Sequence, residues 1–243
     1  RDLDTLISVQ GEPFGSTSIY AQYRVFQLAK EHGITVTLDG QGADELLAGY
    51  QGYPGQRLLS LLESDQYRKA HQFGRSWGTW PGRSYSQALA HLGREVLPDA
   101  LYRRARHAMG RAFEPKWLKT GMLSEAGVAL HEARPFRSAR NRRRRVIERL
   151  AHSLQHRGLP HLLRHGDRNA MAFSIESRVP FLSVPTAELL LSLPEDYLIS
   201  NSGETKHVFR AAMRGIVPDA ILDRRDKIGF ATPERNWLLS IAP

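Results

Sequence analysis

A short segment that begins at Asp39 combines glycines with acidic residues. From Asp39 to Glu45 the sequence reads Asp-Gly-Gln-Gly-Ala-Asp-Glu. Glycines let backbone N–H groups approach an anion closely, and a helix that starts after the loop would add its positive N-terminal dipole. Asp44 and Glu45 could complement that dipole or bind a divalent cation through their carboxylates. The spacing is also typical of a glycine-rich turn with an acidic helix start, so both interpretations stay open on spacing alone.

The residues before this segment place it at the end of a predicted strand. Ser16 can cap a helix over residues 18–31, and Gly33 follows where a helix end favours a positive φ. Ile34–Leu38 is a run of β-formers that predicts a strand covered on both faces, as in a parallel sheet. Ligands of open α/β sheets bind at the carboxyl ends of such strands, which is where Asp39 lies.

The rest of the chain is predicted to be mainly helical. Beyond about residue 53 we identify no convincing strand, and apolar residues recur at helical spacing. The blocks with this spacing are 56–62, 84–92, 116–130, 145–156, 186–193, 204–216 and 233–241. We therefore divide the chain into an α/β nucleotide-site segment, 1–52, and a mainly helical part, 53–243. One strand is too little for a sheet, so we expect the remnant of a doubly wound parallel sheet whose amino-terminal half is missing.

The composition excludes several classes of protein. The chain has 243 residues, of which 41% are hydrophobic and 24% charged, as in ordinary globular proteins. It contains no cysteine, which excludes a disulfide scaffold and a thiol nucleophile within it. No apolar run approaches the roughly 18 residues of a membrane helix, and the chain opens without a signal peptide. We therefore expect a cytoplasmic protein with no membrane partner.

Positive charge is concentrated in one stretch. The net charge is +9, and Arg134–Arg145 holds seven arginines in twelve positions. Such a block attracts polyanions, although like-charge blocks are more often solvated surface segments. No nucleic-acid recognition motif accompanies it. We therefore expect an exposed link here and do not expect nucleic acid as a partner, with a basic nucleic-acid-binding module kept as an alternative.

Two further groups of residues admit a structural and a functional interpretation. Four charged residues could form a buried ion-pair network or shape an acceptor pocket: Asp167, Arg168, Glu176 and Arg178. Two histidine pairs have the i, i+4 spacing of zinc ligands: His152/His156 and His161/His165. Neither pair is accompanied by a third ligand, so no zinc site is expected.

Several segments, in order along the chain, resemble the asparagine synthase family, the glutamine-hydrolysing asparagine synthetases. Leu38–Tyr50 is similar to that family's second ATP-site motif, and Asp167–Leu182 is similar to its long downstream signature. The other matching segments are Glu12–Phe14, Lys206–His207 and Lys227–Pro233. Several motifs in the right order are far more specific than any one of them, and residues 55–155 match least well.

The resemblance implies an adenine nucleotide alpha hydrolase-like fold of the PP-loop type and an ATP-dependent amide-forming reaction. In that reaction the side-chain carboxylate of aspartate attacks the α-phosphate of ATP, and magnesium pyrophosphate leaves. Ammonia from a separate glutaminase domain then displaces AMP to give asparagine. The resemblance thus implies ATP and Mg²⁺ as cofactors and aspartate or another carboxylate as substrate, and a homodimer is a possible assembly.

The resemblance also implies roles for individual residues. The residues implied at the nucleotide are Asp39, Gly40, Gly42, Asp44 and Lys206. Among them Asp44 would bind the magnesium ion, and Lys206 would neutralise phosphate charge. Gln41 would stand at a position linked with forming the adenylate.

The chain departs from the family at several points. Many members have glutamate at the position of Gln41 and serine at that of Asp39, and glutamine cannot act as a base. The family's first pyrophosphate loop and its cysteine nucleophile are missing, so this piece alone is expected to be inactive. Alternatives are a relative that activates another carboxylate (β-lactam-forming, peptide-cyclising or polysaccharide-associated) and a catalytically inactive scaffold.

Overall fold

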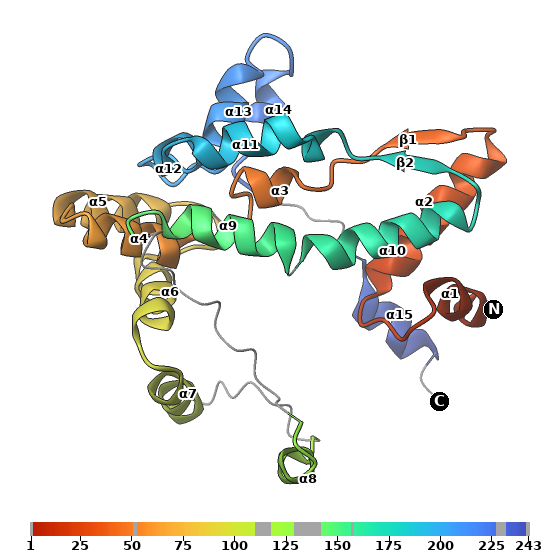
Figure 1. The fold of residues 1–243 in the computed structure, drawn as a ribbon, viewed down its shortest axis with the longest axis horizontal. Helices are drawn as coiled ribbons and strands as arrows, with labels where there is room; N and C mark the ends of the chain where they lie inside the picture. Colours follow the sequence, from red (N-terminus) through yellow and green to blue (C-terminus); the bar gives the residue numbers. More distant parts are fainter. Residues whose placement is uncertain are drawn as a thin grey trace. The chain divides into compact units, whose positions relative to one another are not determined.

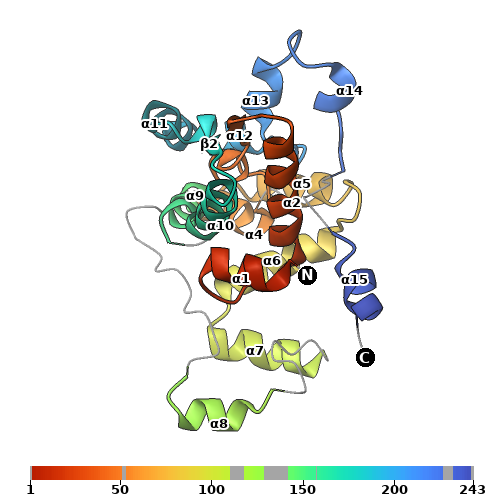
Figure 2. The same ribbon diagram turned by 90° about the vertical axis from the view of Figure 1, so that its right-hand side faces the viewer.

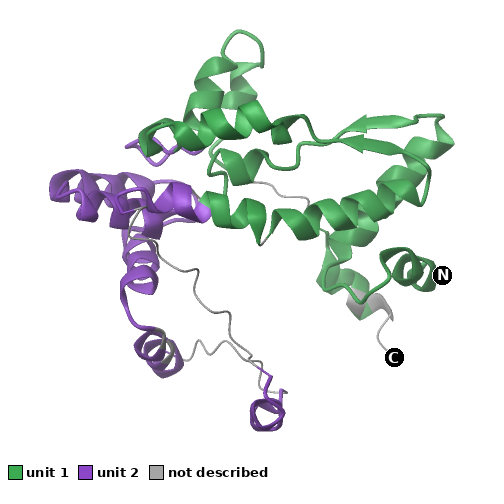
Figure 3. Cartoon of the chain, viewed as in Figure 1, with its two compact units in different colours: residues 1–50, 150–198, 206–243 green, residues 51–149, 199–205 purple. Residues whose placement is uncertain are grey.

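The computed structural model describes residues 2–50, 53–109, 118–128, 142–156, 158–226 and 232–241, and most of them are helical (Figure 1). The chain divides into two compact units (Figure 3). Unit 1 comprises residues 1–50, 150–198 and 206–243, and unit 2 comprises residues 51–149 and 199–205. Each unit is therefore assembled from segments that are far apart in the sequence. The division into 1–52 and 53–243 stays a prediction.

Unit 1 contains a two-stranded parallel sheet. Strand β1, Val36–Leu38, pairs with β2, Glu176–Arg178, and Thr37 lies opposite Ser177. The parallel pairing is of the kind expected for the predicted strand, although β1 starts two residues later than predicted. The expectation of no strand beyond residue 53 is wrong. With only three residues, β2 is too short for an alternating pattern to mark it in the sequence.

Helices make up most of the rest of unit 1 in the part that the structure describes. Their bounds are α1 Leu3–Gln10, α2 Thr17–Glu31, α3 Ala43–Leu46, α10 Leu159–Met171, α11 Val184–Ser192, α12 Glu195–Leu198, α13 His207–Ala212, α14 Asp219–Leu222 and α15 Glu234–Ile241. Helix α9, Arg145–Gln155, contributes residues to both units. The predicted cap of α2 is confirmed, because the Ser16 side chain accepts a hydrogen bond from the backbone N–H of Ser18. Gly33, just beyond α2, has the predicted positive φ, 72°.

The packing of α2 on α10 aligns the two strands (Figures 1 and 2). Phe26 from α2 meets Ala170 from α10 and Ile175 in an apolar cluster, and all three are buried. Each of these helices leads directly into one strand of the sheet. A buried amide pair adds specificity to the same region, because Gln10 Nε2 donates to Asn169 Oδ1 at 2.7 Å. The helix pair therefore brings β1 and β2 together.

Unit 2 is mainly helical in the part that the structure describes. Its helices are α4 Pro54–Glu63, α5 Tyr67–Trp77, α6 Tyr85–Val96, α7 Asp99–Ala108 and α8 Thr120–Glu125. Leu58, Phe73 and Trp77 are buried in its core. Gly55 lets α4 approach α6 closely, since a Cβ there would lie 2.7 Å from the carbonyl carbon of His91. Among the described residues of the whole chain, no helix has the length and apolar character needed to cross a membrane.

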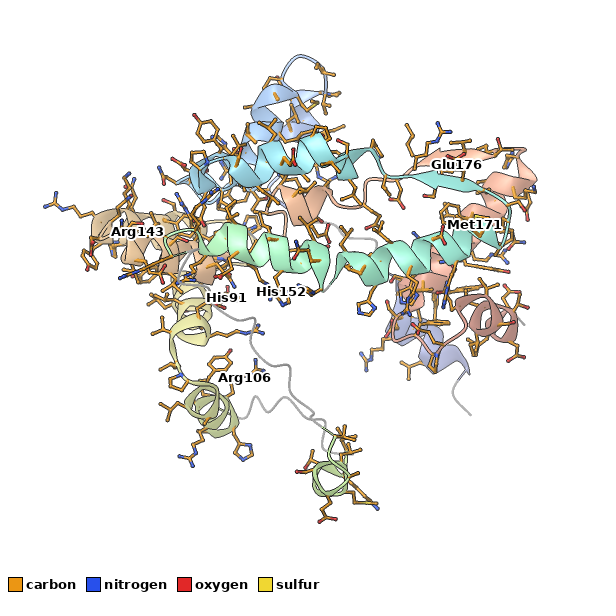
Figure 4. All side chains as sticks on the ribbon, viewed as in Figure 1. His91, Arg106, Arg143, His152, Met171 and Glu176 are labelled. Atoms are coloured by element: carbon orange, nitrogen blue, oxygen red, sulfur yellow. The ribbon has the colours of Figure 1, made fainter. Side chains whose placement is uncertain are left out.

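The positive charge of the chain lies in unit 2, which contains 20 Lys and Arg against nine Asp and Glu. Part of it is structural, because Arg145 is only 8% exposed and donates two hydrogen bonds from its Nε and Nη2 to Glu63 Oε1, at 3.1 and 2.8 Å. Arg143, labelled in Figure 4, also donates its backbone N–H to Glu63 Oε2 at 2.7 Å. The expectation of an exposed link is wrong for Arg145, and residues 134–141 lie outside the described residues.

Candidate functional site

The candidate phosphate loop begins where β1 ends. The backbone N–H of Asp39 donates to the carbonyl oxygen of Arg178 at 2.7 Å, which continues the β1–β2 pairing by one residue. The loop then turns through Gly42 into α3. The loop therefore lies at the carboxyl end of a parallel strand, which is where ligands bind in open α/β sheets.

The two glycines of the loop, Gly40 and Gly42, differ in how much space surrounds them. Gly42 has a φ of 88°, and a Cβ there would lie 2.6 Å from Leu182 Cγ. Glycine is thus required at this position both for the backbone conformation and for the contact with the turn Pro180–Leu182. A Cβ on the exposed Gly40 would meet nothing within 4 Å. Gly40 therefore leaves one side of the loop open to solvent.

Asp39 brings a carboxylate into the loop itself. Its partial burial raises its pKa, because the charged form loses hydration, while hydrogen bonds from the backbone of Gln41 and Gly40 act in the opposite direction. Backbone groups that could bind an anion are thus hydrogen-bonded to the chain's own carboxylate. Gln41 is half-buried in the same turn.

Asp44 and Lys206 form an ion pair across unit 1. Lys206 Nζ lies 2.7 Å from Asp44 Oδ1, and the side chains are 31% and 26% exposed, so solvent reaches both. The neighbouring acid points the other way, since Glu45 is 1% exposed and accepts a hydrogen bond from the Tyr50 hydroxyl at 2.5 Å. Only Asp44 of the acidic pair therefore faces a position that a ligand can reach.

The backbone holds Lys206 in an unusual conformation. Its φ of 57° is left-handed, which costs an L-residue about 1–2 kcal/mol. Its N–H donates to the carbonyl oxygen of Leu47 at 3.1 Å, and its carbonyl accepts from the N–H of Arg210 in α13 at 2.9 Å. These two bonds fix Lys206 between the end of α3 and the start of α13. Strained positions of this kind cluster at functional sites.

The structure brings together segments that the sequence had only placed in order. The loop of Asp39 touches Arg178 and Leu182 of the downstream signature, and α3 meets Lys206. An edge-on contact between the rings of Phe181 and Phe209, with centroids 5.5 Å apart, holds that signature against α13. Lys227–Ala231 lies outside the described residues.

Two contacts were missed from the sequence. Leu182 covers Gly42, and Gly49 lies against the ion pair, since a Cβ at Gly49 would lie 2.6 Å from Asp44 Cγ and 2.8 Å from Lys206 Cε. The sequence offered one signal for Gly49, which is a further glycine three residues after the end of α3. It gives no indication of which residue of a distant segment comes close.

Few side chains at this site could act as ligands of a metal ion. Among the described residues, no three or more His, Asp or Glu side chains are grouped so as to hold a metal ion. Mg²⁺ is commonly held by one or two carboxylates together with substrate phosphates. Of the acidic pair, Asp44 fits that pattern for a cation that arrives with a nucleotide, and Glu45 does not, because it is buried against Tyr50.

The other candidates take structural positions. Glu176 and Arg178, the former labelled in Figure 4, pair with each other at 2.8 Å on β2, with side chains about 60% exposed, so the predicted buried network is wrong for these two residues. His165 Nδ1 lies 2.7 Å from Gln10 Oε1 in the buried amide cluster. The rings of His152 and His156 contact each other edge to face, with centroids 5.2 Å apart.

The comparisons with known proteins agree on one protein family for this chain. The asparagine synthase family profile matches residues 1–243. Asparagine synthetase (glutamine-hydrolyzing) 1 of Bacillus subtilis is 28% identical over 243 residues, covering 93% of this chain and 35% of its own length. Proteins of Mycobacterium tuberculosis and Mycobacterium bovis, provisionally named asparagine synthetase (glutamine-hydrolyzing), are 31% identical over 241 residues, covering 93% of this chain and 34% of theirs. The chain spans about a third of the length of these relatives. No solved structure gives a significant match.

Proposed function

We propose that this chain, which belongs to the asparagine synthase family, carries part of the nucleotide site of an ATP-dependent, amide-forming synthetase. The observation that supports this most is the ion pair between Asp44 and Lys206 beside the loop that follows β1. A carboxylate for a cation and an ammonium for phosphates are held within 2.7 Å of each other, partly exposed, by segments far apart in the sequence.

We propose that β1 and β2 belong to a doubly wound parallel sheet of the PP-loop type. The parallel pairing supports this, because purely parallel strands occur almost only in sheets with both faces covered. Leu38 is 75% exposed and Val36 is 41% exposed, which is unusual for apolar side chains of such a strand. Further strands and helices would cover them.

The proposed reaction joins ammonia to a carboxylate in two steps. An oxygen of the aspartate side-chain carboxylate attacks the α-phosphorus of ATP, the bond to the β-phosphate oxygen breaks, and pyrophosphate leaves with the electron pair. Ammonia, which a separate glutaminase domain would supply, attacks the acyl carbon, and AMP leaves as the amide forms. Mg²⁺ would neutralise charge on the pyrophosphate.

The site residues other than Asp39 have proposed parts in the first step. The Lys206 ammonium would stabilise negative charge that develops on the phosphate oxygens, and a preorganised cation does this without reorganisation cost. Asp44 would bind the cation. Gly40 would let the loop approach the nucleotide, Gly42 would permit the turn that shapes the loop there, and Gln41, which is neutral, would orient substrate through its amide.

The test uses the purified full-length protein with ATP, Mg²⁺ and ammonia. Asparagine and AMP should form when aspartate is present and not when it is omitted. Product formation from a different carboxylate alone would instead favour a relative with another acceptor. If no carboxylate supports pyrophosphate exchange, the inactive-scaffold alternative replaces the proposal. We further propose a cytoplasmic location, which fractionation of cells would check, and a homodimer, which sizing of the same preparation would check.

A second candidate function rests on the charge of unit 2. Its 20 basic against nine acidic residues would attract a polyanion, and Arg142–Arg144 are exposed. The use of Arg145 in binding Glu63 weakens this alternative, because it gives part of the arginine run a structural role. Salt-dependent retention of nucleic acid would support it.

A further inference from the structure

We propose that Gly49 is a positioning residue of the nucleotide site, because its missing side chain leaves the space in which Asp44 and Lys206 meet. The proposal rests on the proposed function and adds a residue to the machinery. A Cβ at Gly49 would lie 2.6 Å from Asp44 Cγ and 2.8 Å from Lys206 Cε. Carbon atoms that are not bonded do not approach so closely, so any side chain there displaces both partners.

The requirement at Gly49 is for space and not for an unusual backbone conformation. The φ values outside the ordinary region include those of Gly42 and Ala48, and Gly49 is not among them. Alanine could therefore adopt the backbone geometry of Gly49. This sets Gly49 apart from Gly42, where the φ of 88° alone disfavours other residues.

The backbone around Gly49 cannot easily move away from a side chain added at this position. Its N–H donates to the carbonyl oxygen of Asp44 at 2.9 Å, which closes the turn after α3. Leu46, Leu47 and Ala48 are all buried, with at most 1% of their surface exposed. Buried, close-packed segments resist displacement. A methyl group at position 49 would therefore move the two partly exposed side chains, Asp44 and Lys206, out of their present positions.

Displacement of these side chains should affect the nucleotide site more than the fold. Both charges lie where the cation and the phosphates are proposed to bind, and a shift of about 1 Å can cost on the order of 100-fold in rate. The ion pair itself is partly exposed, and such pairs contribute about 0–1 kcal/mol to stability. Gly49→Ala should thus lower kcat/KM for Mg·ATP in pyrophosphate exchange by about 10–100-fold.

The test compares Gly49→Ala with Gly15→Ala in the full-length protein. Gly15 is exposed, its φ is not positive, and a Cβ there meets nothing within 4 Å, so it is a matched glycine without crowding. The aspartate-dependent exchange of pyrophosphate into ATP is measured against Mg·ATP concentration. We expect the 10–100-fold loss for Gly49→Ala and a change of less than about twofold for Gly15→Ala. Equal exchange in the two variants would overturn the proposal.

A stability measurement separates crowding from general damage. Gly49→Ala is introduced both into the parent protein and into Asp44→Ala, where the crowding carboxylate is gone. The unfolding midpoint should fall in the parent background and fall less in the Asp44→Ala background, where only Lys206 Cε still lies close to the added methyl group. An equal fall in both would overturn the proposal, because the limiting contact would then not be Asp44. If the unmodified protein shows no exchange, the proposed function fails, and the two midpoints still decide whether Gly49 makes room for Asp44.

Discussion

Replacing Lys206 by glycine and by alanine should separate its chemical role from its backbone strain. Both substitutions remove the ammonium group, which lies 2.7 Å from Asp44, and so both should lose pyrophosphate exchange. The loss of one preorganised charge from such a site costs on the order of 100–1,000-fold in rate. The two variants differ in how well they tolerate the left-handed φ of 57° and in the conformational freedom that they lose on folding.

The expected difference in stability follows from that angle. A left-handed conformation costs an L-residue about 1–2 kcal/mol, and alanine keeps this cost while glycine does not. For glycine, about 0.5–1 kcal/mol of this advantage is offset, because glycine loses more backbone conformational freedom on folding than alanine does. Lys206→Gly should therefore be about 0.5–1 kcal/mol more stable than Lys206→Ala.

The assay is thermal unfolding of the two full-length variants, alongside exchange of labelled pyrophosphate into ATP. The glycine variant should unfold about 1–3 °C above the alanine variant, with exchange lost in both. An alanine variant as stable as the glycine variant would refute the strain at Lys206. Exchange at the unmodified rate in either variant would refute the proposed role of its ammonium group.

Four further changes have expected outcomes. Arg145→Ala should destabilise the protein by about 2–3 kcal/mol in urea unfolding, because it removes the ion-pair partner of the half-buried Glu63 carboxylate, while the exposed Arg142→Ala should stay within about 0.5 kcal/mol. Burial alone would raise the pKa of Glu63, but hydrogen bonds from Arg145 and Arg143 lower this pKa below its usual 4.5. The ionised carboxylate therefore stabilises the fold above pH 4.5, and this stabilisation is lost as the pH falls through the lowered pKa of the folded state. Glu63→Gln should accordingly lose less stability than the parent protein does when the pH falls below 4.5. An equal loss of stability in the two proteins would contradict the stabilising role of the Glu63 carboxylate. Asp39→Asn should bind Mg·ATP about fivefold more tightly, measured by calorimetry, since it removes a negative charge beside the phosphates; weaker binding would show that the carboxylate assists. Triple replacement of Arg142, Arg143 and Arg144 by serine should leave retention on a nucleic-acid column at moderate salt unchanged, and a large loss would favour the polyanion alternative.

Local signals in the sequence predicted the elements that depend on local structure. Helix α2, its Ser16 cap and the positive φ of Gly33 follow from neighbouring residues, and all three are confirmed. Strand β2 could not be predicted in the same way, because three residues carry no period and their strand state comes from pairing with β1. The residues near β2 in the sequence carry no signal that a strand so distant in the chain will pair with it.

The candidate site was predictable as a set of motifs and not as a geometry. Nothing local distinguishes Asp44 from Glu45, yet one faces Lys206 and the other is buried against Tyr50. That choice depends on the helix rotation that the core imposes. The structural role of Arg145 was hidden for a similar reason, because Glu63, its partner, belongs to a separate helix.

The most direct test of the central claim is chemical labelling of Lys206 in the full-length protein. An amine-acylating reagent is applied with and without Mg·ATP, and the modified lysines are quantified by mass spectrometry. Exposed Lys30, on α2, serves as the internal control. If the phosphates bind at Lys206, Mg·ATP should slow its modification several-fold and leave Lys30 unaffected. Equal labelling of Lys206 with and without saturating Mg·ATP would contradict the account.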